Sequence, residues 1–225
     1  MSWGQLTFSQ RTKVRLLLEE HVRENIPGFK VVEKSGSPWM KTLSKILFFT
    51  PDFMGRFVTT LYPKVYVPSK LRWESNNFSS IITLAHEYVH LSDRKRLKLL
   101  FNFLYLSPQV LAVFALLCPI NPWCLLFLLC LLPIPSPGRT WAEFRGYRMS
   151  MATYYWLSGE RYNAQFMAHQ FTSSNYYWMF PFESFLKGVL DREYKKIVAD
   201  DLPPELREVK NVLTASIGAV YNKLV

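Results

Sequence analysis

Hydrophobic and polar residues alternate along the chain with two different periods. Over residues 9–24 the apolar positions recur with helical spacing, which predicts an amphipathic helix ended by Pro27-Gly28. A second helix is expected over 38–49, where apolar residues mix with lysines, so that it could lie on a membrane surface or pack on a soluble core. Residues 56–61 and 64–67 are rich in β-branched and aromatic residues, which predicts a short antiparallel strand pair.

A longer helix is expected after this strand pair, because Asn76 and Asn77 can cap a helix that runs to the basic cluster 94–98. The edge of the strand pair beside this helix could bind an extended peptide through backbone hydrogen bonds, or the pair could be purely structural. Further helices are expected over 140–157, 184–199 and 203–224.

An uncharged stretch, residues 99–138, separates the two halves of the chain. Its first limb, 99–117, could approach the thickness of a bilayer core of about 30 Å, whereas the second limb, 123–134, is too short to span one unaided. Pro119, Asn121 and Pro122 form a turn between the limbs, which predicts a helical hairpin. Basic residues before and after it favour a membrane hairpin with both ends on the cytoplasmic side. The alternative is an apolar hairpin buried in a soluble core or an oligomer.

The predicted fold is therefore mainly α with a small antiparallel β element (α+β), formed by a single domain over 1–225 into which the hairpin 99–138 is inserted. The chain has 225 residues, of which 49% are hydrophobic and 16% aromatic. This composition excludes a disordered chain. The pattern predicts no particular oligomeric state.

The net charge of +10 indicates an anionic partner, either lipid headgroups or nucleic acid. Because no basic-aromatic module supports nucleic-acid binding, we expect lipid as the partner and no nucleic acid. Cys118, Cys124 and Cys130 lack the spacing of a zinc ribbon, and their odd number implies no disulfide framework. The first residues lack the apolar core of a secretory signal, which favours an active site facing the cytoplasm.

The strongest chemical signal is the H-E-x-x-H run formed by His86, Glu87 and His90. Residues four apart lie on one face of a helix, so the two imidazoles can bind one Zn²⁺ ion. Glu87, between them, can take a proton from a zinc-bound water. The alternative is a pair of core histidines with unrelated partners.

The third ligand is expected far along the chain. Arg96 occupies the position where an extended motif would carry a third histidine, and the spacing of Asp93 suits an acceptor behind a ligand better than a ligand. Glu143, on the helix that follows the hairpin, is the strongest candidate. A hairpin would bring it to the same side as His86 and His90, which a single membrane span would not do.

Two alternatives to this ligand remain open. Residues 140–143 also form a capping box, in which Glu143 would only satisfy a helix N-terminus. His169 and Glu160 are the other candidates for the third ligand.

His86, Glu87, His90 and the downstream Glu143 together resemble the gluzincin pattern of zinc metallopeptidases. The apolar hairpin between motif and glutamate is similar to membrane-embedded endopeptidases of the CAAX-prenyl protease and heat-shock membrane protease type. The approach through Thr59-Thr60 and 65–68 also resembles small gluzincin-like proteins of phage genomes. The likeness covers about residues 57–150, and the chain departs from the membrane endopeptidases in carrying Gly146-Tyr147 where they have Ala-Asp.

The resemblance implies a zincin-like fold and hydrolysis of a protein or peptide substrate, with Glu87 as the catalytic base. A donor for the oxyanion is also needed. His169 is our first candidate for this catalytic role, followed by Tyr147, Tyr176 and Tyr177. The sequence thus predicts a zinc-dependent endopeptidase at a membrane face. The alternative is a non-catalytic membrane or assembly protein with a structural zinc site.

Overall fold

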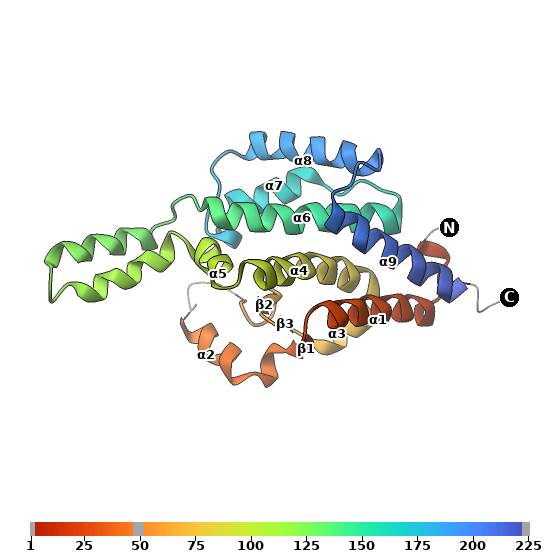
Figure 1. Ribbon diagram of the computed structural model, residues 1–225, viewed down its shortest axis with the longest axis horizontal. Helices are drawn as coiled ribbons and strands as arrows, with labels where there is room; N and C mark the ends of the chain where they lie inside the picture. Colours follow the sequence, from red (N-terminus) through yellow and green to blue (C-terminus); the bar gives the residue numbers. More distant parts are fainter. Residues whose placement is uncertain (1–2, 47–51, 222–225) are drawn as a thin grey trace.

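The computed structural model describes residues 3–46 and 52–221, which form a mainly helical protein with one small sheet (Figure 1). This confirms the predicted fold class at the level of mainly α with a small β element. The α-helices are α1 (Phe8–Asn25), α2 (Pro38–Ile46), α3 (Lys70–Ser75), α4 (Asn77–Leu97), α5 (Leu99–Leu106), α6 (Pro137–Ser158), α7 (Ala164–Thr172), α8 (Glu183–Val198) and α9 (Pro204–Tyr221). The 3₁₀-helices are η1 (Trp3–Gln5), η2 (Lys34–Gly36), η3 (Gln109–Leu117), η4 (Pro122–Leu131) and η5 (Ser174–Tyr176), and the strands are β1 (Lys30–Glu33), β2 (Thr59–Leu61) and β3 (Lys64–Val67).

The helix starts follow local capping chemistry. Thr7 and Gln10 form a capping box at α1, each side chain accepting a hydrogen bond from the other residue's backbone N–H. The predicted cap of α4 is confirmed, since the Asn76 side chain accepts from the backbone N–H of Ser79. Pro137 stands in the first turn of α6, where its missing N–H costs no helical hydrogen bond.

The sheet is mixed, with the strand order β1-β3-β2. The predicted antiparallel pair is confirmed as β2 against β3, with Thr60 opposite Val65, although the first strand begins at Thr59 and not at residue 56. The sequence pattern did not predict β1, which pairs in parallel with β3 and makes the sheet mixed instead of purely antiparallel. The strand is only four residues long, and its partner lies beyond α2, so the alternation along it carries little signal.

The hydrophobic core lies between α1, α4, α6 and α9, with α4 and α6 side by side at its centre (Figure 1). The predicted helices over 9–24, 140–157, 184–199 and 203–224 correspond to α1, α6, α8 and α9, although residues 222–224 lie outside the described part. Core side chains that are almost completely buried come from all four central helices: Val14, Leu18, Leu84, Ala85, Met149, Ala152, Leu206 and Val209.

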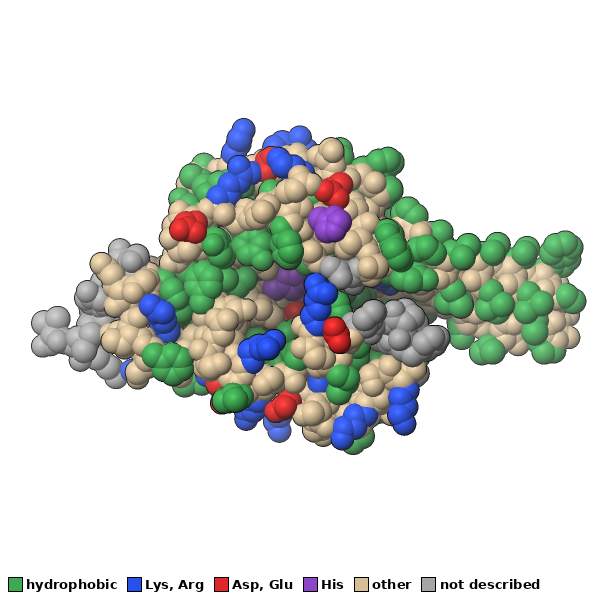
Figure 2. Space-filling view, turned by 180° about the vertical axis from the view of Figure 1, so that it is seen from behind, with side chains coloured by type: hydrophobic (Ala, Val, Ile, Leu, Met, Phe, Trp, Pro, Cys, Tyr) green, Lys and Arg blue, Asp and Glu red, His purple; other side chains and the backbone are tan. Residues whose placement is uncertain are grey.

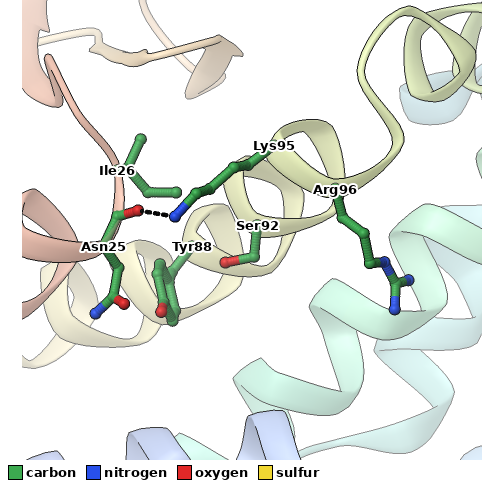
Figure 3. Close-up of a pocket in the computed structure, with 6 residues that line it drawn as sticks. All are labelled: Asn25, Ile26, Tyr88, Ser92, Lys95 and Arg96. Atoms are coloured by element: carbon green, nitrogen blue, oxygen red, sulfur yellow. Dashed lines mark hydrogen bonds between the residues drawn. The ribbon is translucent and has the colours of Figure 1, made fainter.

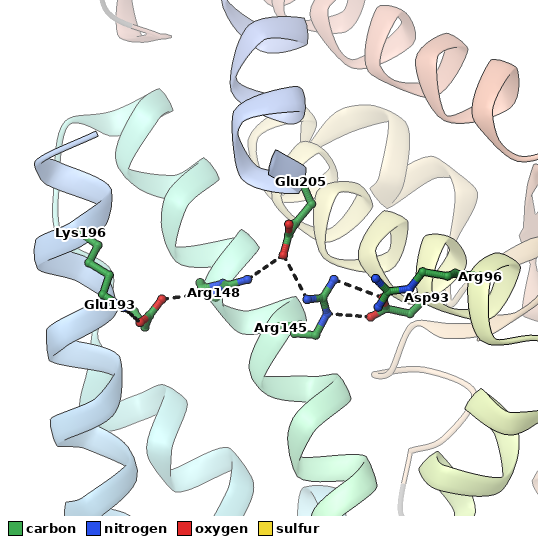
Figure 4. Close-up of polar contacts among 7 residues, drawn as sticks. All are labelled: Asp93, Arg96, Arg145, Arg148, Glu193, Lys196 and Glu205. Atoms are coloured by element: carbon green, nitrogen blue, oxygen red, sulfur yellow. Dashed lines mark hydrogen bonds and ion pairs between the residues drawn. The ribbon is translucent and has the colours of Figure 1, made fainter. Parts of the chain in front are cut away.

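An ion-pair network joins the central helices on one side of this core (Figure 4). Buried Asp93 on α4 accepts two hydrogen bonds from the Arg145 guanidinium of α6, at 2.9 and 3.2 Å. Glu205 at the start of α9 binds both Arg145, at 3.1 Å, and Arg148, at 2.8 Å. Arg148 also reaches Glu193 of α8 at 3.3 Å. The network fixes the positions of four helices relative to one another.

The uncharged stretch forms a hairpin that projects from the helical body (Figure 1). Its first limb is not the single helix predicted over 99–117, because Ser107-Pro108 divides it into α5 and η3, which are bent by 92° relative to each other. Pro108 has no backbone N–H that could continue the helical hydrogen bonds of α5. Within the described residues, no one helix has both the length and the apolarity to cross a membrane, and only this bent pair satisfies both when taken together.

The helix predicted over 38–49 is described as far as Ile46, so the prediction for its last residues lies outside the described part. Trp39 of α2 is 76% exposed, whereas Met40 beside it is completely buried against Phe53 and Tyr66. The helix therefore packs on the sheet side of the molecule and also presents an aromatic side chain to the surroundings.

Candidate metal centre

Helix α4 places His86 and His90 one turn apart on the face that packs against α6. The two rings are 4.8 Å apart between centroids, and both side chains are buried. Their Nε2 atoms lie 3.0 Å from each other. Two neutral imidazoles with these atoms unprotonated would repel, so the arrangement calls for a proton or a cation between them.

Glu143 approaches the same point from α6. Its Oε2 lies 3.5 Å from Nε2 of His86, and its Oε1 lies 3.7 Å from Nε2 of His90. The capping-box alternative for this residue is wrong, because α6 begins at Pro137 and Glu143 therefore lies inside the helix. Thr140 instead donates its hydroxyl to the carbonyl oxygen of Met179.

The spacing of these donors fits a small metal ion. One ligand atom from each of the three residues can be chosen so that all lie within 4.8 Å of one another. Tetrahedral bonds of about 2.0–2.1 Å place pairs of ligand atoms about 3.3 Å apart. Nε2 of His86 lies at similar distances from Nε2 of His90, 3.0 Å, and from Oε2 of Glu143, 3.5 Å. Glu143 Oε2 is also buried without a hydrogen-bond partner in the described structure. The buried group of His86, His90 and Glu143 could therefore hold a metal ion.

The charges of this group are strongly coupled. Burial on its own raises the pKa of Glu143, but His90, His86 and the Tyr105 hydroxyl outweigh it and lower that pKa to about 2. Burial lowers the pKa of His90, helped by the charge of His86. Burial also lowers the pKa of His86, but the adjacent Glu143 carboxylate and the charge of Glu87 outweigh burial and leave that pKa raised. Near neutral pH the carboxylate is thus ionised, as a metal ligand must be.

Helix α6 fixes the orientation of the His86 ring. Its Nδ1 lies 3.0 Å from the hydroxyl of Ser150, which can accept its N–H and so leave Nε2 free to ligate. The ring also packs against the backbone at Gly146, where an added Cβ would lie only 2.5 Å from Nε2. Glycine at this position, one of the departures from the membrane endopeptidases, is therefore required by the close approach of α6 to the histidine.

Glu87 lies beside the three potential ligands at the edge of the sheet. Its side chain is 8% exposed, and its Oε2 accepts a hydrogen bond of 2.6 Å from the Thr60 hydroxyl of β2. A cleft of about 420 Å³ opens next to His86 and Glu87. The remaining lining is mostly aromatic or aliphatic, with one arginine and a few hydroxyls: Arg56, Phe57, Val58, Phe78, Ser79, Ile82, Thr83, Tyr147, Ser150, Tyr154, Tyr162 and Tyr176.

The structure does not bring every predicted residue to this place. His169 lies on α7 with its side chain 62% exposed, and its Nδ1 is 3.3 Å from Glu183. Glu160 follows α6 and accepts from the Tyr154 hydroxyl at an exposed position. Asp93 is held by Arg145, so it belongs to the ion-pair network and not to the ligand group.

The tyrosines in and around the site have different partners. Tyr147 contacts the His86 ring at 5.2 Å between centroids, and its hydroxyl is 3.3 Å from that of Tyr176. Tyr177 instead donates to the carbonyl oxygen of Leu131 in the hairpin. Tyr105, which the sequence did not single out, donates a hydrogen bond of 2.5 Å to Oε1 of Glu143.

A second hollow, of about 330 Å³, lies on another side of α4 near the end of α1 (Figure 3). The Lys95 ammonium in this hollow already donates to the backbone oxygen of Asn25 at 2.7 Å. The hollow includes no potential metal ligand of the group described above. Its lining residues are Asn25, Ile26, Tyr88, Ser92, Lys95 and Arg96.

Comparison of the chain with protein-family models, with curated proteins and with solved structures found no match.

Proposed function

We propose that this protein is a zinc-dependent endopeptidase that works at a membrane face. The observation that carries the proposal is one juxtaposition: the buried donors His86, His90 and Glu143 lie beside Glu87 at the end of an open cleft. Zincin-like chemistry requires this combination of ligands, base and access.

The donor set favours zinc in a catalytic role. Two imidazoles and one carboxylate form a ligand set that zinc enzymes use, whereas structural zinc sites are closed by four protein ligands and are usually rich in cysteine. The described residues supply three donors, which leaves a fourth position for water or substrate. Bound zinc would polarise the scissile carbonyl and make the attacking water more acidic.

Glu87 is the general base of the proposed reaction. It takes a proton from the attacking water while the water oxygen bonds to the carbonyl carbon, and it passes that proton to the amine nitrogen as the C–N bond breaks. The Thr60 hydroxyl bound to Oε2 holds the carboxylate in one orientation.

The cleft provides a place for a protein or peptide substrate. Strand β2 is the edge strand of the sheet beside α4, so an extended peptide could pair with it next to Glu87. Tyr147 and Tyr176 bring hydroxyl groups to the cleft and are better candidates for oxyanion donors than His169, which faces Glu183.

Glu87→Gln tests the catalytic proposal. This change keeps the size of the side chain but removes the base, so we expect unchanged zinc content and a loss of peptidase activity of about 10²-fold or more. Glu74→Gln on α3 is the matched control, because Glu74 is about half exposed and, among the residues that the structure describes, pairs only with Lys70 across one helical turn. Cleavage of a quenched fluorescent peptide library and metal analysis are measured on all three proteins.

The outcomes separate the two candidate functions. Zinc together with cleavage that Glu87→Gln abolishes supports the endopeptidase. Zinc bound without any cleavage would favour the non-catalytic protein with a structural site. Absence of zinc from the purified wild-type protein, or equal cleavage by the Glu87→Gln variant, would contradict the proposal.

The membrane part of the proposal rests on the surface of the hairpin. Figure 2 shows the projecting hairpin covered by hydrophobic side chains. Ile120 and Trp123, next to its turn, are 83% and 75% exposed. An apolar surface of this kind needs a non-aqueous neighbour. With basic residues on both sides of the hairpin, we propose that it enters the cytoplasmic leaflet and that the active site faces the cytoplasm.

Flotation with phospholipid vesicles tests this membrane contact. We expect wild-type protein to float with the vesicles and the double variant Ile120→Asp/Trp123→Asp to remain in solution. Leu71→Asp on α3 is the matched control, because Leu71 is 78% exposed but lies outside the hairpin. A wild-type protein that stays monomeric without detergent and does not float would contradict the proposal, and stable oligomers would favour a hairpin buried between copies.

A further inference from the structure

The base of the hairpin touches the metal centre directly, through α5. The Tyr105 hydroxyl donates to Oε1 of Glu143 at 2.5 Å. The rings of Tyr105 and Phe101 each lie 6.2 Å from the His90 ring, between centroids. One short helix of the hairpin therefore contacts two of the three potential ligands.

The two carboxylate oxygens of Glu143 have different contacts. Oε1 is taken by Tyr105, whereas Oε2 is buried and has no hydrogen-bond partner among the described residues. Oε2 lies 3.5 Å from Nε2 of His86, whereas Oε1, which Tyr105 holds, lies 3.7 Å from Nε2 of His90. The arrangement is that of a carboxylate held by one oxygen so that the other can ligate.

His90 depends on the hairpin for a different reason. His86 has the Ser150 hydroxyl behind its Nδ1, but Nδ1 of His90 has no hydrogen-bond partner in the described structure. Its ring is therefore oriented by packing, and Phe101 and Tyr105 provide aromatic surfaces for it.

Tyr105 is itself held firmly against the start of α6. Arg139 donates to the backbone oxygen of Tyr105 at 3.1 Å and to the Gln109 side chain at 3.0 Å. Ser136 donates to the backbone oxygen of Ser107. At Gly138 an added Cβ would collide with the backbone oxygen of Leu104, so the two segments are in close contact. The bend after α5 then separates this fixed base from the projecting tip.

We infer that Tyr105 is a positioning residue of the metal centre, and that the base of the hairpin completes the site by orienting Glu143 and His90 for metal binding. This inference rests on the proposed function for the identity of the metal as zinc. It assigns the hairpin two separate parts: α5 serves the metal centre, and the tip beyond the bend does not.

Zinc affinity measured by competition with a chromogenic chelator tests the inference. Tyr105→Phe removes only the hydroxyl, and we expect it to weaken zinc binding about 10–100-fold, as is usual for partners behind a ligand. Gly138→Ala, which pushes the hairpin base away from α6, should weaken binding in the same direction. Tyr194→Phe on α8, where the ring packs against Tyr155, is the matched control and should bind zinc like the wild type.

Two further measurements distinguish positioning from a general loss of structure. The visible spectrum of the cobalt-substituted protein should change in Tyr105→Phe, because the geometry of the carboxylate ligand changes. The double variant Ile120→Ser/Trp123→Ser should keep the wild-type affinity and spectrum, since only the tip is altered.

Wild-type zinc affinity and an unchanged cobalt spectrum in Tyr105→Phe would overturn the inference while leaving the proposed function intact. A Tyr105→Phe protein in which only the thermal stability of the metal-free form is lowered would overturn it as well. Failure of the wild-type protein to bind zinc would instead overturn the proposed function, and the inference with it.

Discussion

The metal centre and the tip of the hairpin belong to the same α4–hairpin–α6 unit, yet their exposure to solvent is opposite. In the centre, ionisable side chains of His86, His90 and Glu143 are buried and contact one another. At the tip, the large apolar side chains of Ile120 and Trp123 are mostly exposed. Both arrangements are unfavourable for an isolated chain in water, the first because charge is desolvated and the second because apolar surface is hydrated.

The two regions therefore suit different neighbours under the proposed function. The centre brings together donors that could hold a cation, which would balance Glu143 and separate the two facing imidazole nitrogens. The exposed apolar side chains of the tip suit lipid or another apolar surface. Helix α5 lies between them, with its buried Phe101 and the Tyr105 hydroxyl directed to the centre, while Leu99 at the start of the same helix is 74% exposed. A change in one region should therefore leave the other intact unless it acts through α5.

Glu143→Ala is expected to have the largest effect, and only at the centre. Loss of one of three protein ligands should weaken zinc binding by more than about 100-fold, a larger effect than removal of a partner behind a ligand. Chelator competition measures the affinity, and vesicle flotation should remain unchanged. Glu160→Ala is the control at one of the two other predicted candidate ligands. Equal zinc binding by Glu143→Ala and the wild type would place the ligand elsewhere.

Gly146→Ala tests how tightly α6 packs on His86. The added methyl group has no room beside the imidazole, so we expect about 1–3 kcal/mol of lost stability together with weaker zinc binding. Gly188→Ala on α8 adds the same group in open space and should raise the stability by up to about 1 kcal/mol. Urea unfolding of both variants gives the comparison. A Gly146→Ala protein as stable as the wild type would mean that α6 lies farther from the histidine.

Lys34 provides a pH test of the helical body. It is a buried cation there, whereas the hairpin carries no charged residue that could titrate. Its Nζ donates to the backbone oxygen of Phe53 at 2.6 Å and lies 3.8 Å from the centre of that ring. Burial lowers the pKa of Lys34 to about 8, against the opposing charge of Glu87. Since the folded pKa lies below the unfolded one, the unfolded chain binds more protons between about pH 8 and 10.5, and stability rises across this window.

Lys34→Met should lack this rise. From pH 8 to 10.5 we expect the wild type to gain roughly 2–3 kcal/mol relative to the variant, with little relative change below about pH 7. Chemical unfolding of both proteins at a series of pH values measures the difference, in which the titration of all shared groups cancels. If the free energies of unfolding of the two proteins run parallel across the whole pH range, Lys34 has the same pKa in the folded and the unfolded chain, and the prediction is wrong.

The smallest expected effect is on the stability of the body when the tip is changed. Ile120→Ser removes an exposed apolar side chain that contributes little to the core, so the free energy of unfolding in detergent should change by less than about 0.5 kcal/mol. Vesicle flotation of the same variant should nevertheless decrease. A large loss of stability would show that the tip packs against the body or against another copy.

Much of this arrangement follows from local sequence, and the rest from contacts between distant residues. The cap at Asn76, the helix carrying His86 and His90, and the return of the chain to Glu143 were all predictable from spacing and turn residues. Strand β1 was not, because its partner lies far along the chain.

The contacts behind the ligands were missed for the same reason. Ser150 stands seven residues after Glu143, two turns along the same face of α6, and this helical spacing could have identified it. For Tyr105 no such signal exists, since its contact with Glu143 depends on how the hairpin bends. The importance of Gly146 likewise appears only when α6 is placed against His86.

X-ray absorption at the zinc edge of the purified protein tests the central claim most directly. We expect one zinc ion per chain, with two imidazole nitrogens and oxygen ligands at about 2.0–2.1 Å and no sulfur. Absence of zinc, or a sulfur shell at about 2.3 Å from the hairpin cysteines, would contradict it.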